Sequence, residues 1–194
     1  MRFPWAHREH RGARGGFDGS PDCEVRAPVR SGSAGPTGND LDIRIAWKKA
    51  DTTIEADVKA LWTRLNILPP DVDPEERVRE VVLAAYRGDS IAAVAGASLL
   101  YLPGLRCRMA LYRSVIGPTK RGGELSALIA RRSRAVLEQW SQENPSEGVM
   151  GIAARLPASE VKIPPREASM GLALAGFSKD GERLMVTWFD HALV

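Results

Sequence analysis

The residues whose types and spacing best fit chemistry lie between Tyr112 and Leu128. An apolar, strand-forming run ends at Gly117-Pro118, a basic and glycine-rich loop covers 119–123, and a helix is predicted from Glu124 to about Ser141. The unpaired N–H groups of such a loop and of the first helical turn, together with the helix dipole, can bind an anion. The segment therefore predicts a site for a phosphate-bearing ligand.

Charged and small residues in this loop would strengthen an anion site. Lys120 and Arg121 add positive charge, and Gly122 and Gly123 let the backbone approach a phosphate without an intervening Cβ. The order of residues in this loop matches neither the glycine fingerprint of Rossmann folds nor the Walker pattern of nucleoside-triphosphate-binding loops. An ordinary strand-to-helix turn, in which Glu124 stabilises the start of the helix, is the alternative interpretation.

The run from Ile116 to Leu128, Ile-Gly-Pro-Thr-Lys-Arg-Gly-Gly-Glu-Leu-Ser-Ala-Leu, resembles a segment of the GNAT superfamily of acyl-CoA-dependent N-acyltransferases. In that family the segment reads V-x-P-x-x-R-G-x-G-x-G/A-x-x-L and holds the pyrophosphate of coenzyme A. Glu124 departs from the pattern, since the family usually has glycine there. The residues that the resemblance places at the cofactor are Ser114, Val115, Ile116, Lys120, Arg121, Gly122, Gly123, Glu124, Leu125 and Ser126.

The order of elements along the chain agrees with this resemblance. Hydrophobic periodicity and turn residues predict strands over 41–47, 81–86, 91–101, 106–116, 148–156, 172–177 and 184–194, and helices over 53–66, from Asp73-Pro74, and over 124–141. The resemblance implies an α/β fold with a mixed, mostly antiparallel sheet flanked by helices. It also implies that the strands ending at Ile116 and at Leu156 form a parallel pair that splays apart where coenzyme A binds.

Several local expectations accompany this element order. Thr52 or Thr53 is expected to cap the first helix, and Arg131, Arg132 and Arg134 are expected on the solvent face of the long helix. The small residues of the stretch 92–97 suggest close approach by a helix or a ligand.

Residues for proton transfer are scarce. Relatives usually have a tyrosine that protonates the departing thiolate, and counting back from Gly176-Phe177 puts Leu172 at that position. Tyr112 is the nearby acid that we can name, although a packing role on its strand is the alternative. Asp190 and His191 are adjacent near the C-terminus, but a structural role is favoured over a catalytic triad because no nucleophile is evident.

Composition limits the class of protein. The chain has 194 residues, is 44% hydrophobic and carries a net charge of +3, which fits one soluble domain without a nucleic-acid surface. No run approaches the ~18 apolar residues of a membrane span. Residues 1–40 have the composition of a disordered tail or a start-site artefact, so the domain is expected over 41–194. Cys23 and Cys107 suggest no disulfide framework, and a cytoplasmic location is expected.

The sequence therefore predicts an N-acyltransferase that uses acetyl-CoA or another acyl-CoA, without a metal, and acylates a small-molecule or peptide amine. A homodimer is left open. A degenerate member that binds coenzyme A, or that serves only as an interaction module, is the first alternative, and Glu124 and Leu172 favour it. A binder of a different phosphate ligand is the second.

Overall fold

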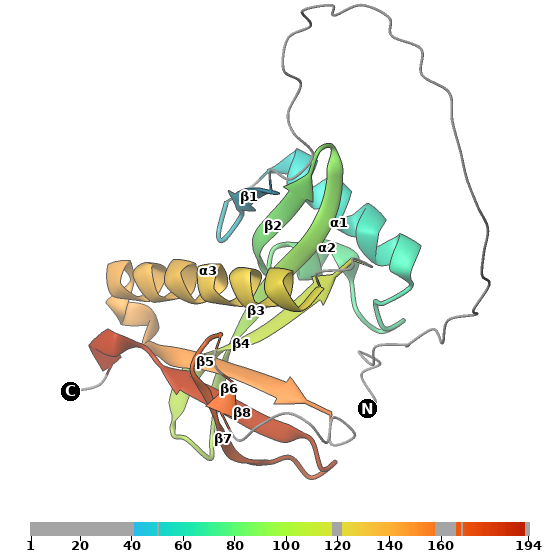
Figure 1. Cartoon of the computed structure of the whole chain (residues 1–194). Helices are drawn as coiled ribbons and strands as arrows, with labels where there is room; N and C mark the ends of the chain where they lie inside the picture. The colour runs from blue at the N-terminus through green and yellow to red at the C-terminus, as the bar shows by residue number, and fades with distance from the viewer. Residues whose placement is uncertain (1–40, 50, 118–121, 158–165, 168, 193–194) are drawn as a thin grey trace, which may run out of the picture.

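The computed structural model describes residues 41–49, 51–117, 122–157, 166–167 and 169–192. Its strands lie side by side in one sheet, in the order β1-β2-β3-β4-β5-β8-β7-β6, and Figure 1 shows this sheet with the long helix crossing it. The strands are β1 (Leu41–Ile45), β2 (Val81–Arg87), β3 (Ser90–Leu102), β4 (Cys107–Ile116), β5 (Val149–Leu156), β6 (Arg166–Glu167), β7 (Leu172–Phe177) and β8 (Arg183–Trp188). The helices are α1 (Thr52–Leu65), α2 (Pro74–Val78) and α3 (Gly122–Glu143), with short 3₁₀ turns at Pro145–Glu147 and Asp190–Ala192.

The mixed sheet expected from the sequence is confirmed. Neighbouring strands pair antiparallel except for β4 and β5, which are parallel. A parallel pair requires a crossover connection, and α3 supplies it between these two strands.

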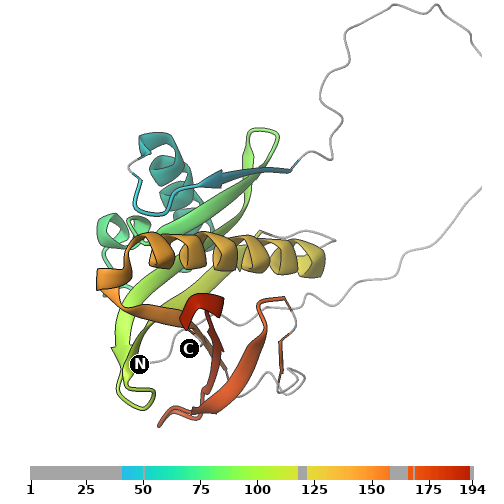
Figure 2. The same ribbon diagram turned by 90° about the vertical axis from the view of Figure 1, so that its left-hand side faces the viewer.

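Helices cover both faces of the sheet. The apolar side of α1 packs with α2 against one face of β2, β3 and β4, and α3 packs against the other face, as Figures 1 and 2 show from two directions. Because it is covered on both sides, β2 is buried along almost its whole length. The core thus includes one layer between the sheet and α1–α2 and one between the sheet and α3.

The small residues in β3 let α3 approach the sheet closely, as the sequence suggested. Ala93 and Ala95 are fully buried against Leu125 and Ile129 of α3, because alanine adds little height to the sheet surface. On the opposite face Gly96 has no side chain, and an added Cβ would lie 3.1 Å from the carbonyl oxygen of Glu80.

Two local expectations were wrong. The cap of α1 is Asp51 rather than Thr52 or Thr53, and its carboxylate accepts hydrogen bonds from the N–H groups of Thr53 and Ile54. Asp at this position satisfies two unpaired donors and interacts with the positive end of the helix dipole.

Arg134 does not lie on the solvent face of α3 with Arg131 and Arg132, which are exposed. Its guanidinium donates to the Thr187 hydroxyl at 2.8 Å and to the Asp190 carboxylate at 2.9 Å. This arginine therefore ties α3 to the end of β8, a contact that helix periodicity alone does not reveal.

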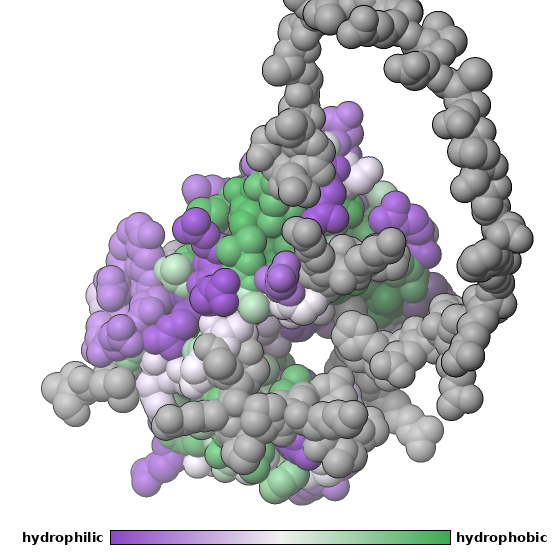
Figure 3. Space-filling model, viewed as in Figure 1, coloured by the Kyte–Doolittle hydropathy of each residue, from purple (hydrophilic) through white to green (hydrophobic). Residues whose placement is uncertain are grey.

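Figure 3 shows the polar surface gathered over the C-terminal end of α3.

The C-terminal part departs from the sequence prediction in its length. The last strand, expected over 184–194, ends at Trp188, because residues 190–192 turn into a 3₁₀ helix that packs back toward α3. Between β5 and β7 the described residues hold only the two-residue β6.

The tail predicted over residues 1–40 lies outside the described residues. Among the described residues, no helix is long and apolar enough to cross a membrane.

Candidate functional site

The parallel strands β4 and β5 separate partway along their length. Their pairing ends at Tyr112 with Ala154, after which β5 continues to pair only with β8. The N–H of Gly117 donates to the carbonyl of Ala92 at 2.8 Å, and backbone groups of an antiparallel strand alternate in direction. The backbone groups of Ser114 and Ile116 therefore face away from β3, toward the side where β5 has diverged.

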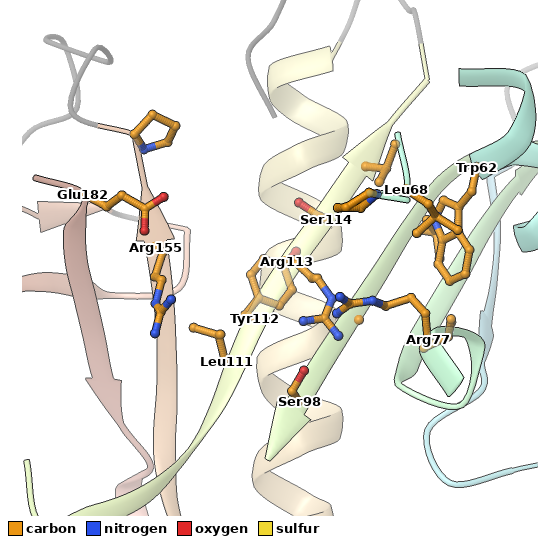
Figure 4. Close-up of a pocket in the computed structure, with 16 residues that line it drawn as sticks. Trp62, Leu68, Arg77, Ser98, Leu111, Tyr112, Arg113, Ser114, Arg155 and Glu182 are labelled. Carbon is orange, nitrogen blue, oxygen red and sulfur yellow. The ribbon is translucent and has the colours of Figure 1, made fainter. Parts of the chain in front are cut away.

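A cavity of about 290 Å³ lies where these strands diverge. One wall comes from the α1–α2 side and from β3 and β4, and the other from β5 and the β7–β8 turn, as Figure 4 shows. Its apolar lining includes Trp62, Leu68, Pro69, Val81, Val94 and Val115. Its charged lining consists, among the described residues, of Arg77, Arg113, Arg155 and Glu182.

Two of the arginines share one carboxylate. The Glu80 Oε2 atom accepts a hydrogen bond from Arg77 Nη1 at 3.1 Å and a short one from Arg113 Nη2. Burial lowers the pKa of Arg113 to about 10; Glu80 opposes this fall and Arg77 adds to it. The two guanidiniums point toward one another at the cavity wall in Figure 4. Because they share a single carboxylate, this wall has an excess of positive charge.

The cofactor residues expected from the sequence divide into those at the start of α3 and those on β4. At the start of α3, Gly122 and Gly123 open the helix, and an added Cβ at Gly123 would meet nothing within 4 Å. Glu124 is exposed in the first turn, whereas Leu125 is buried against the sheet, so only its backbone is available to a ligand. The positions expected for Lys120 and Arg121 lie outside the described residues, and Ser126 is half-buried on α3.

The strand residues of the expected site all belong to β4. Ser114 and Val115 line the cavity together with Tyr112, and Ile116 packs beside Leu125 of α3. The ring of Tyr112 also packs against the core under α3, so the structure brings this residue to the cavity while giving it a packing role. Leu172, at the position of the usual tyrosine, is buried at the start of β7.

Asp190 and His191 are directed to different partners. Asp190 accepts from Arg134, while His191 Nε2 lies 3.1 Å from the hydroxyl of Ser141. That hydroxyl donates its proton to the carbonyl of Val149 at 2.6 Å, so the imidazole must act as the donor to Ser141. The serine is thus a donor within the core rather than an activated nucleophile, which agrees with the structural role expected from the sequence.

Five charged residues of this site escaped the sequence analysis. They come from four separate segments of the chain and lie together only around the divergence of β4 and β5: Arg77 and Glu80, Arg113, Arg155, and Glu182. The one available signal was a Glu and an Arg three residues apart near α2, and charged pairs at that spacing are common on helix surfaces. Among the described residues, no group of His, Cys, Asp and Glu could hold a metal ion.

No family model matches the chain, and no curated protein sequence matches it. Solved structures do. An acetyltransferase of the GNAT family from Streptococcus pneumoniae aligns with a TM-score of 0.51 and 15% identity, over 77% of this chain and 99% of its own. YncA, a putative acetyltransferase from Salmonella typhimurium solved with its cofactor acetyl-CoA, aligns with a TM-score of 0.51 and 14% identity, over 78% of this chain and 95% of its own.

An N-acetyltransferase from Staphylococcus aureus Mu50 aligns at a TM-score of 0.50 and 8% identity, over 77% of this chain and 98% of its own. At such low identity the likeness concerns the fold. It agrees with the parallel β4–β5 pair, the crossover helix α3 and the antiparallel pairing of β7 with β8. The resemblance found in the sequence is therefore confirmed at the level of structure: this chain has the fold of the GNAT acetyltransferases.

Proposed function

We propose that the protein is an N-acyltransferase that moves an acetyl or another acyl group from acyl-CoA to a primary amine. The observation that carries the proposal is the divergence of β4 from β5. It leaves the backbone groups of Ser114 and Ile116 on the edge of β4 from which β5 has diverged, where Ser114 lines the cavity. This edge leads toward the N-terminus of α3. An extended thioester fits such an edge, and a pyrophosphate fits a helix start that opens with two glycines.

Backbone groups supply most of the chemistry in this proposal. The N–H groups of Ser114 and Ile116 bind the pantetheine arm and polarise the thioester carbonyl, which stabilises the oxyanion formed on attack. The amine nitrogen forms a bond to the carbonyl carbon, and the C–S bond then breaks. Holding both reactants in one cavity contributes much of the rate enhancement over the uncatalysed reaction.

Two protons must move during this reaction. The ammonium form of the acceptor must lose a proton before attack, and the departing thiolate must gain one. Glu182 supplies the one carboxylate among the described residues that line the cavity, which suits it as the base. Tyr112 is the proposed acid, since Leu172 carries no proton to donate.

Calorimetry with acetyl-CoA, followed by thiol release with a panel of amines, tests the proposal. Gly122→Val places a branched side chain where the pyrophosphate would approach, and should weaken acetyl-CoA binding at least tenfold, about 1.4 kcal/mol. Gly104→Val is the matched control, because a Cβ at that turn would meet nothing within 4 Å. Equal acetyl-CoA affinity in both variants would refute the cofactor site.

A CoA-binding interaction module is the second candidate. Exposed Glu124 at the helix start and buried Leu172 in place of the usual acid favour it. Binding of acetyl-CoA without acylation of any amine in the panel would select this module over the enzyme. Absence of acetyl-CoA binding would exclude both candidates.

A further inference from the structure

The charges around the cavity point to the chemistry of the acceptor. Three arginines and one glutamate line it among the described residues. Arg77 and Arg113 stand on the wall formed by α2 and β4, and their shared partner Glu80 carries one negative charge against their two. An uncompensated cation at a half-buried wall is costly unless an anion can approach it.

With respect to the described residues, these two arginines retain unused donors. Each guanidinium has five N–H groups in a planar fork that matches the two oxygens of a carboxylate. In the described part of the chain, each donates one hydrogen bond to a side chain, in both cases to the same Glu80 oxygen. Their side chains are 20% and 26% exposed, and both reach the cavity.

The position of the pair separates it from the proposed cofactor site. Residues of β4 alternate between the two faces of the sheet, and Val115 packs with Trp62 on the α1 side whereas Ile116 packs with α3. Arg113 therefore shares the α1–α2 face with Val115. The arginine pair lies beside the edge of β4 from which β5 has diverged, on the face opposite the helix whose start would hold the pyrophosphate.

The surroundings of the pair are apolar. Trp62 and Leu68 from the α1–α2 side and Val94 from β3 line the same cavity. A ligand that places an anion on the arginines would bury a hydrophobic body against these side chains. A volume of about 290 Å³ suits a small molecule rather than a folded partner.

We propose that the acceptor is a small amine that also carries a carboxylate and an apolar side chain, as an apolar amino acid does, and that Arg77 and Arg113 bind the carboxylate. This inference rests on the proposed acyl transfer. The amine lone pair attacks the thioester carbonyl, the C–N bond forms, the C–S bond breaks, the amine loses its proton to a base, and the thiol leaves protonated. The product is an N-acyl amino acid that keeps its negative charge.

Because the product keeps the carboxylate, the arginine pair can be tested without acyl-CoA. The probes are N-acetylphenylalanine and N-acetylphenylalaninamide, which differ in the charge of one group. Calorimetry on the full chain should show at least tenfold tighter binding of the carboxylate. Arg113→Met and, independently, Arg77→Met should abolish the preference, whereas Arg132→Met on the exposed side of α3 should preserve it.

Equal binding of the two probes, or no binding of either, would overturn the inference. If both Arg113→Met and Arg77→Met still bind the carboxylate probe more tightly than the amide, the inference is also overturned. The same holds if Arg132→Met loses this preference to the same extent, because the carboxylate would then respond to the overall charge of the protein and not to contact with the arginine pair. The proposed function fails separately, through absence of acetyl-CoA binding. A carboxylate preference together with that failure would leave a carboxylate site without acyl transfer.

Discussion

Arg113→Met should make the protein more stable while removing part of the candidate acceptor site. Arg113 is largely buried, and burial lowers the pKa of its guanidinium to about 10 even though Glu80 lies against it. A folded-state pKa below the ordinary arginine value means that the folded protein disfavours the charged form. The cost is fully present below about pH 10, and it disappears only when the pH rises above the ordinary arginine pKa.

The magnitude follows from this fall in pKa. A tenfold change in proton affinity is worth about 1.4 kcal/mol, so the fall corresponds to on the order of 3 kcal/mol. Solvent reduces the effect, since the side chains of Arg113 and Glu80 are 26% and 34% exposed. Methionine fills the space of the arginine stem, and Glu80 keeps its bond to Arg77. We therefore expect a gain of about 1–2 kcal/mol, or roughly 2–8 °C in Tm.

Urea unfolding between pH 6 and 8 measures this gain, with Arg132→Met as the matched control. The control should change the free energy of unfolding by less than about 0.5 kcal/mol, because Arg132 is exposed. The difference between Arg113→Met and the unaltered protein should stay constant over this range, since both pKa values of Arg113 lie well above it. A loss of more than about 1 kcal/mol would refute the reasoning and show that Arg113 stabilises the fold through Glu80.

Two further predictions concern the packing of β5 and the transfer of protons. Gly151→Ala should cost about 1–3 kcal/mol in urea unfolding, because the added Cβ would press on the Thr187 carbonyl oxygen and lie 2.9 Å from the Trp188 Cα; an unchanged midpoint would contradict the tight β5–β8 pairing. Tyr112→Phe and Glu182→Gln should each lower the transfer rate by roughly a hundredfold in steady-state assays. The Glu182→Gln loss should shrink at a pH where the acceptor amine is already deprotonated, and a pH-independent loss would exclude its role as a base.

Local signals in the sequence were sufficient for the long helices, for most of the strands and for the parallel pair. The apolar run before Ile116, the glycines before α3 and the short apolar strand after it predicted a strand–helix–strand unit, and the structure has one. These signals work because periodicity and turn chemistry act between residues close in the chain. The GNAT resemblance rested on the same stretch and led to the correct fold.

Contacts between distant segments decided the rest. Arg134 and His191 find their partners across α3 and β8, at separations of about fifty residues along the chain. The early end of β8 follows from the same docking, since residues that bond back to α3 cannot continue in the sheet.

The charged part of the candidate site also depended on tertiary structure. The charged residues that line one cavity do so only because β4 diverges from β5 there: Arg77 on α2, Arg113 on β4, Arg155 on β5 and Glu182 after β7. Each of these residues in isolation has the pattern of an ordinary surface charge. The sequence by itself thus determined where a cofactor phosphate is expected, through backbone groups of consecutive residues. The tertiary structure decided which side chains face the cavity, because charge and burial at its wall depend on segments that are far apart in the sequence.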